Sequence, residues 1–214
     1  MTTIPATITN GFFEKIHGDA YDRFRHDVAG HQLTVVHDDG LYRHLRLSNP
    51  DRSSYWYEII TFPGSLVIRG DMGTYLFTRE EDMFGFFGTG DINPGYWAEK
   101  TPSYGREHGI KTYQSEIFES TIKSMAVDFV NDHQVLDIKA FHTALEIGVL
   151  TDIGDQHTAV QAAYDFSWNG LAVFPEIHAL DFTQYTPQYL WCCLAIPYAI
   201  RHYNAAKAPQ ENTP

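Results

Sequence analysis

The residues best suited to metal chemistry lie in one segment in the second half of the chain. His133 and Asp137 stand four residues apart, and His142 and Glu146 repeat that spacing. Residues four apart share one face of a helix, so each pair could offer an imidazole and a carboxylate to one metal ion. A complete site needs further ligands, and no Cys-x-x-Cys or His-Glu-x-x-His motif supplies them. We therefore predict no metal and no cofactor, and keep these four residues as the ligands of an alternative, metal-dependent enzyme.

Nucleophilic catalysis finds equally little support in the sequence. The only cysteines, Cys192 and Cys193, are adjacent and lie in an apolar run, so we expect two reduced, buried thiols. No Gly-x-Ser-x-Gly motif is present. Gly70 and Gly73 are spaced as in a phosphate-binding loop, but they stand between two β-type runs and predict a hairpin turn. No catalytic residue is identified, and the sequence favours a protein that is not an enzyme.

The distribution of charge carries more information. The chain has 15 Lys and Arg against 27 Asp and Glu, a formal net charge of −12. Direct nucleic-acid binding is disfavoured because no basic stripe is present to neutralise phosphates. Between residues 124 and 200 the only Lys or Arg is Lys139. A solvated face is the simpler interpretation of this acidic segment, and a surface for a basic partner is the alternative. The interaction candidates in it are Asp128, Asp132, Asp137, Glu146, Asp152 and Asp155.

Two aromatic residues join these interaction candidates. Tyr96 and Trp97 lie between Gly88 and Gly109, in a segment with five glycines and two prolines. That composition predicts an ordered surface loop. Aromatic side chains that remain at a surface favour protein interfaces and ligand pockets. The loop is therefore a second candidate for partner contact.

The elements that position the candidate residues are predicted to be strands in the first half of the chain and helices in the second half. Period-two alternation predicts five strands joined by turns, and the third strand has no cleanly polar face, which places it centrally. Strands followed by helices segregate into layers. We therefore predict an α+β fold in which an antiparallel meander of about five strands packs against a C-terminal group of helices. The expected strands are 33–36, 41–47, 55–61, 66–69 and 74–78, and the expected helices are 17–29, a short one before Gly88, 115–130, 135–149, 157–166 and 187–203.

These elements are expected to form one domain over residues 1–204, β-rich over 31–78 and helical over 110–204, with a flexible tail over 205–214. The last helix is apolar nearly all round, which predicts a buried position. The first residues lack the features of a secretory signal, and no run approaches the roughly 20 apolar residues of a membrane span. Together with the reduced thiols, these features predict a cytoplasmic protein without membrane contact.

Three blocks of the chain, residues 57–87, 92–100 and 190–203, resemble a group of uncharacterised bacteriophage and prophage proteins. The matching stretches are Phe62-Pro63-Gly64, Gly70-Asp71-Met72-Gly73-Thr74-Tyr75, Glu81-Asp82-Met83-Phe84, Ile92-Asn93-Pro94-Gly95-Tyr96-Trp97-Ala98-Glu99-Lys100 and Leu190-Trp191-Cys192-Cys193. They cover under half of the chain, and near Tyr198 the Trp-Gly pair expected in that group is missing. The resemblance carries no activity and no functional residues. It implies a setting, a small accessory protein made by a virus inside a bacterial cell.

The charge distribution and the resemblance combine into one hypothesis. We expect a phage-encoded accessory protein that binds a host protein with a basic surface in the host cytoplasm. An anti-defence inhibitor of the anti-restriction or anti-CRISPR type fits this description, because DNA-binding surfaces of defence nucleases are basic. Two alternatives stay open, a metal-dependent hydrolase or nuclease and a small-ligand binding domain with a pocket between sheet and helices. Self-association into a homo-oligomer is also left open.

Overall fold

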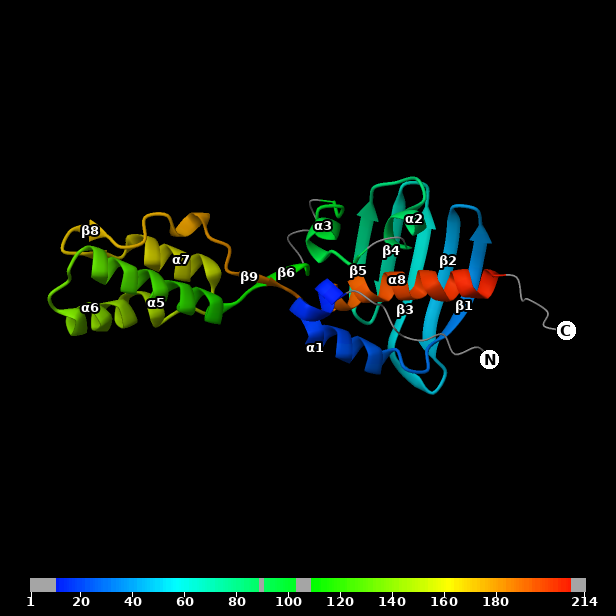
Figure 1. Cartoon of the computed structure of the whole chain (residues 1–214), viewed down its shortest axis with the longest axis horizontal. Helices are drawn as coiled ribbons and strands as arrows, with labels where there is room; N and C mark the ends of the chain where they lie inside the picture. The colour runs from blue at the N-terminus through cyan, green and yellow to red at the C-terminus, as the bar shows by residue number, and fades with distance from the viewer. Residues whose placement is uncertain (1–10, 89–90, 103–108, 209–214) are drawn as a thin grey trace. The chain divides into compact units, whose positions relative to one another are not determined.

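The computed structural model describes residues 11–88, 91–102 and 109–208 (Figure 1). The sequence predicts one domain over residues 1–204, whereas the chain divides into two compact units. The sheet unit comprises residues 1–111 and 185–214, and the helical unit comprises residues 112–184. Each unit has a hydrophobic core of its own. The short strands β6 (Lys111–Tyr113) and β9 (Thr183–Tyr185), where the chain passes between the units, pair with each other.

Five antiparallel strands build the sheet unit, in the sequential order of a meander. The predicted α+β class and the five-stranded antiparallel sheet are confirmed. The third strand lies at the centre of the sheet, as its apolar faces predict. The strands are β1 (Gln32–Asp39), β2 (Tyr42–Asn49), β3 (Arg52–Phe62), β4 (Ser65–Gly70) and β5 (Gly73–Thr78).

The turn between β4 and β5 explains why glycine stands at its first position. Gly70 and Gly73 are paired across the hairpin, which confirms the turn predicted for them. A Cβ atom on Gly70 would lie 2.2 Å from the carbonyl oxygen of Trp56 and 2.8 Å from the Cα of Tyr57. The backbone of β3 approaches too closely for any side chain. The glycines therefore serve strand packing and not phosphate binding.

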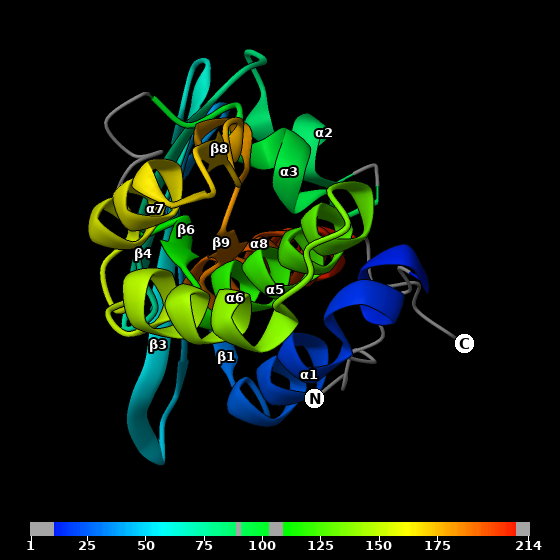
Figure 2. The ribbon, with the colours of Figure 1, turned by 90° about the vertical axis from the view of Figure 1, so that its left-hand side faces the viewer.

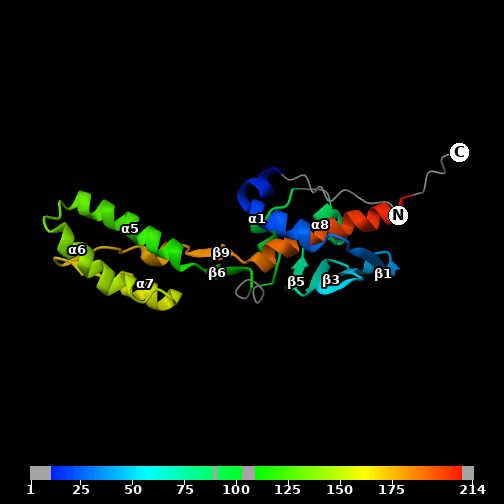
Figure 3. The same ribbon diagram turned by 90° about the horizontal axis from the view of Figure 1, so that it is seen from below.

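Helices cover one face of this sheet. Figure 3 shows α1 (Gly11–Asp27) and α8 (Pro187–Lys207) on the same side of the strands. The short helices α2 (Met83–Gly88) and α3 (Pro94–Ala98) belong to the same unit and contribute Phe87 and Trp97 to its core. The sequence missed α3, which begins at Pro94 after the Asn93 cap, in the segment predicted to be a loop.

Helix α8 is the centre of the sheet unit. Every residue from Tyr189 to Ile200 is buried, as the apolar sequence predicts. The predicted burial of the two thiols is confirmed, with 1% of Cys192 and 0% of Cys193 exposed. This burial raises the pKa of both thiols. The helix extends to Lys207 and so includes the start of the predicted tail; residues 209–214 lie outside the described part of the chain.

The helical unit packs three predicted helices around a separate core (Figure 2). The expected segments 115–130, 135–149 and 157–166 are helical, and they surround Phe118, Phe141 and Phe174 in a core of their own. The second of them ends in a π-helical turn, η1. The elements are α5 (Ser115–Asp132), α6 (Ile138–Leu145), η1 (Glu146–Leu150), α7 (Gln156–Asp165), the hairpin β7 (Ser167–Trp168) and β8 (Leu171–Ala172), and η2 (Ile177–Ala179).

No helix among the residues described here is both long enough and apolar enough to span a membrane.

We expect Trp191→Ala to lower the free energy of unfolding by about 3–5 kcal/mol, the usual cost of removing a large buried aromatic side chain. Only 3% of Trp191 is exposed, and its indole meets the rings of Phe24 and Tyr57 edge to face at 5.2 and 5.3 Å. Urea unfolding followed by circular dichroism measures the change. Trp56→Ala, at a partly exposed position, is the control and should cost less. A loss of less than about 1 kcal/mol for Trp191→Ala would contradict the central role of α8.

Candidate functional site

All six acidic interaction candidates lie in the helical unit, and all six are exposed. This unit holds eleven Asp and Glu against two Lys, so it carries nine of the twelve net negative charges of the chain. Asp128 and Asp132 stand four residues apart on α5 and share one face of that helix. Asp152 lies between η1 and α7. The acidic candidates are therefore distributed over the unit and not gathered at one point.

Two of the acidic candidates have a structural role. The Asp137 carboxylate accepts a hydrogen bond from the backbone N–H of Ala140 at 2.9 Å and caps α6. The Asp155 carboxylate accepts from the N–H of Thr158 at 2.9 Å and caps α7 in the same way. This backbone hydrogen bond lowers the pKa of Asp155. Both residues end up at these positions because a helix N-terminus favours a carboxylate acceptor.

Glu146 belongs to a small ion-pair group between α5 and η1. Its carboxylate lies 4.0 Å from the Lys123 ammonium, which donates to Glu119 at 2.6 Å. The hydrogen bond to Glu119 raises the pKa of Lys123. All three side chains are substantially exposed, so this group contributes little to stability.

The four alternative metal ligands do not come together. The His133 Nδ1 lies 3.1 Å from the carbonyl oxygen of Phe129, and its ring stacks on the Phe129 ring at 4.2 Å between centroids. Asp137 is occupied as the cap of α6, and Glu146 faces Lys123. Within the described ranges, no group of three or more His, Cys, Asp or Glu side chains is placed to hold a metal ion. The i,i+4 spacing does not assemble a site, because the side chains of His133, Asp137 and Glu146 each have a different local partner.

Tyr96 and Trp97 lie in different environments. Trp97 is 4% exposed and meets the ring of Phe87 edge to face at 4.7 Å, so it belongs to the core of the sheet unit. Tyr96 is 39% exposed and has the Lys100 ammonium over its ring at 4.0 Å. The two aromatics do not form the surface pair that the sequence suggested, because α3 turns one inward and the other outward.

An apolar groove on the helical unit was not predicted. It has a volume of about 660 Å³, is widely open, and is lined along α6 and η1 by Ala140, Ala144, Ile147 and Gly148. Ile147 is 72% exposed. The sequence carried a signal for the groove, since Phe141, Leu145 and Val149 already fill the buried face of this helix and the remaining apolar residues must face elsewhere.

Two more apolar side chains are exposed close in sequence to the groove residues. Leu136 is 99% exposed and Ile138 is 49% exposed, immediately before and at the start of α6. The π-helical turn η1 adds a residue to the helix at the groove, and such turns often occur at functional sites. Asp137, Lys139 and Thr143 also line the groove, so polar side chains of both charges lie beside its apolar residues. Contiguous exposed apolar surface rimmed by polar residues is typical of protein-interaction sites.

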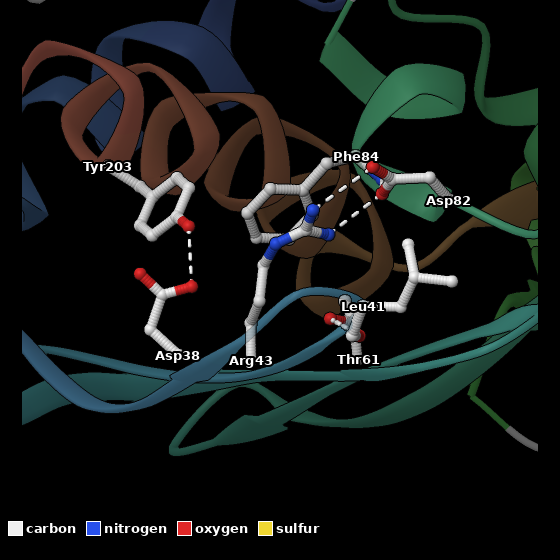
Figure 4. Close-up of polar contacts among 7 residues, drawn as sticks. All are labelled: Asp38, Leu41, Arg43, Thr61, Asp82, Phe84 and Tyr203. Atoms are coloured by element: carbon white, nitrogen blue, oxygen red, sulfur yellow. Dashed lines mark hydrogen bonds and ion pairs between the residues drawn. The ribbon is translucent and has the colours of Figure 1, made fainter. Parts of the chain in front are cut away.

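The sheet unit contains a polar cluster that sequence reasoning missed. Figure 4 shows the Arg43 guanidinium over the Phe84 ring, with two hydrogen bonds to Asp82 at 2.8 and 3.0 Å. Beside it, the Tyr203 hydroxyl donates to Asp38 at 2.8 Å. The guanidinium holds the pKa of Asp82 below its usual range. These contacts join β1, β2 and the start of α2 to the end of α8, so we assign them a structural role.

A second buried charge lies on the opposite face of the sheet. Glu58, on β3, is 4% exposed and accepts hydrogen bonds from Arg46 at 2.9 Å and Arg69 at 2.7 Å. The Nε2 of His44 lies 3.3 Å from the same carboxylate. Burial acts to raise the pKa of Glu58, but the hydrogen bonds from Arg69, Arg46 and His44 outweigh it, and the pKa is lowered. The cluster ties together β2, β3 and β4.

No family model, curated protein or solved structure matches the chain. The resemblance to bacteriophage and prophage proteins therefore stays a prediction.

We expect Glu58→Gln to lower the free energy of unfolding at pH 7 by about 1–3 kcal/mol, because two guanidinium groups lose a charged acceptor. Since the folded state lowers the pKa of Glu58, its contribution is present above the unfolded pKa near 4.5 and is lost as the pH falls through the folded value. Urea unfolding from pH 7 to pH 3 should show a smaller loss of stability in the variant than in the wild type. The exposed residue Glu80 provides the control, Glu80→Gln. Identical pH dependence in Glu58→Gln and wild type would refute this role.

Proposed function

We propose that this chain is a protein-binding protein without catalytic activity, and that its helical unit binds a basic partner through the groove on α6 and η1. The observation that carries the proposal is the combination, within one 73-residue unit, of a net charge of −9 and an exposed apolar groove. Charge alone keeps a protein soluble, and an apolar groove alone could bind many ligands. Together they select a partner that is basic and presents apolar side chains.

The apolar side chains supply the affinity in this proposal. Ile147 and Leu136 are exposed at 72% and 99%, so a partner that covers them removes a large apolar area from water. The small side chains of Ala140 and Ala144, with Gly148, let a partner segment lie close to the helix backbone. Interfaces of this kind concentrate their binding energy in a few well-covered apolar residues.

The acidic side chains supply attraction and selectivity. Only Lys123 and Lys139 oppose the eleven carboxylates of the unit, and Lys123 is already paired with Glu119. A basic partner is therefore drawn toward the unit, and a nucleic acid is repelled from it. Rim charges of this type act mainly on the association rate and its dependence on salt.

The resemblance to phage and prophage proteins supports a more specific form of the proposal. In that setting the partner is a bacterial host protein, and a defence nuclease with a basic DNA-binding surface fits the charge of the helical unit. The chain would then act in the host cytoplasm as an anti-defence inhibitor that occupies this surface.

We expect the immobilised full chain to capture a basic protein from bacterial lysate at about 50 mM NaCl and to release it at about 500 mM, where surface charges are screened. Ile147→Gln should reduce the captured amount by about fivefold or more, because it places an amide in the apolar groove. Quantitative mass spectrometry of the eluted proteins measures both effects. The same material, purified without an affinity tag, should hold no stoichiometric transition metal by elemental analysis.

Val36→Gln is the matched control, since Val36 is 53% exposed but lies on β1 in the sheet unit. It should capture the same protein as the wild type. Equal capture by wild type and Ile147→Gln, or capture that is insensitive to salt, would remove the groove from the proposal. A stoichiometric metal would favour the metal-dependent enzyme instead.

A further inference from the structure

A small cavity in the sheet unit brings together two charges and two aromatic rings. It has a volume of about 170 Å³ and lies between α1, β3, the β4–β5 turn and α8. Arg23, Asp27, Tyr55 and Trp191 line it, together with apolar residues that include Met72. Pockets for drug-sized ligands measure about 300–1,000 Å³, so this cavity holds a much smaller molecule. It lies in a different unit from the groove and is independent of the proposed protein binding.

Asp27 supplies a carboxylate that is largely removed from water. Its side chain is 13% exposed, and one carboxylate oxygen accepts a hydrogen bond from the Nε1–H of Trp191 at 3.2 Å. The other oxygen lies 3.6 Å from Nδ1 of His26, whose side chain is 80% exposed. The carboxylate is thus oriented by the indole but lacks a close cationic partner in the cavity among the described side chains. A bound cation would meet a desolvated negative charge there.

Tyr55 is held at the cavity wall in a strained conformation. Its φ angle is +64°, a left-handed value that is unfavourable for an aromatic residue. The side chains of Asp71 and His31 hold this backbone in place. The Tyr55 N–H donates to the Asp71 carboxylate at 2.6 Å, and His31 Nε2 donates to the Tyr55 carbonyl oxygen at 2.9 Å. The Tyr55 ring consequently stacks beside the Trp191 indole, with 6.4 Å between centroids and an interplanar angle of 24°.

Arg23 supplies the opposite charge. It lies four residues before Asp27 on α1 and lines the same cavity. Its Nε donates to the carbonyl oxygen of Asp19 at 3.2 Å, and within the described part of the chain its terminal nitrogens are left for another acceptor. A simple cation would be repelled by this group, whereas a molecule with both charges would satisfy both residues.

We propose that the cavity binds a small zwitterion of the betaine type, a methylated ammonium group joined to a carboxylate by a short linker. The ammonium group lies against Asp27 and the rings of Tyr55 and Trp191, where a carboxylate and aromatic faces both attract it. The carboxylate of the ligand pairs with the Arg23 guanidinium. This ligand accounts for the two charges, the two rings and the small volume of the cavity together.

The indole N–H signal of Trp191 tests the proposal, because this group contacts Asp27 inside the cavity. The chain has four tryptophans, so ¹H–¹⁵N spectra contain four indole signals, and Trp191→Phe identifies the relevant one. Glycine betaine should shift this signal saturably, with a dissociation constant of about 1 mM or lower. Choline, which lacks the carboxylate, should bind about tenfold more weakly. The uncharged carbon analogue of the ammonium group, 3,3-dimethylbutanoate, should not shift the signal.

Variants of Asp27 and Arg23 test which residue binds the ammonium end of the ligand and which binds its carboxylate end. Asp27→Asn keeps an acceptor for the indole and should weaken glycine betaine binding by about tenfold or more, through loss of the charge. Arg23→Gln should weaken glycine betaine to the level of choline and leave choline unaffected or improved. Asp22→Asn, an exposed carboxylate on the same helix that does not line the cavity, should bind like the wild type.

Three results would overturn the inference. The Trp191 signal could remain unshifted by glycine betaine at about 10 mM. The carbon analogue could bind as tightly as glycine betaine, which would show a purely apolar pocket. Asp27→Asn and Asp22→Asn could behave alike while both unfold at the same urea concentration as the wild type.

Discussion

The sheet unit depends on the burial of α8 on every side. Twelve consecutive residues of this helix are buried. The polar groups at the ends of its aromatic side chains therefore need hydrogen-bond partners inside the unit. Tyr189 donates to the carbonyl of Pro94 on α3, Trp191 donates to Asp27 on α1, and Tyr203 donates to Asp38 on β1. One buried helix thereby sets the positions of three other elements. The cavity beside Trp191 is a consequence of the same arrangement, since the indole that orients Asp27 also forms its wall.

The two units use their apolar residues differently. The sheet unit encloses a helix that is apolar all round, whereas the helical unit builds a smaller core from one face of each helix. On α6 and η1 that core uses Phe141, Leu145 and Val149, and the apolar residues left over face outward. With most of the net charge of the chain on the same unit, this surplus distinguishes the helical unit from an ordinary solvated domain. The proposed partner binding therefore belongs to the helical unit, and the proposed small-ligand cavity belongs to the sheet unit.

Residue types and spacing identified candidate site residues but did not predict their local contacts. Asp137 and Asp155 are exposed residues of an acidic segment, but their capping role depends on where α6 and α7 begin. The four alternative metal ligands are not brought together, because His133 turns back to its own helix and Asp137 to the N-terminus of the next. Trp97 was expected near the surface with Tyr96, yet the short helix α3 separates their directions. In each case a local hydrogen bond or the start of a helix sets the direction of the side chain, and residue spacing does not reveal either.

Local sequence patterns are sufficient to predict most of the helices and strands of this protein. Period-two alternation and glycine-rich turns specify five strands between residues 32 and 78 and their meander order, because neighbouring strands joined by short turns pair with each other. The apolar run of α8 likewise predicts its burial. The formation of a second unit by the remaining helices could be seen only in the folded structure. The same is true of the cavity around which Asp27, Tyr55 and Trp191 meet. These residues come from three distant parts of the chain, and hydrophobic periodicity describes which face is buried without specifying which partner buries it.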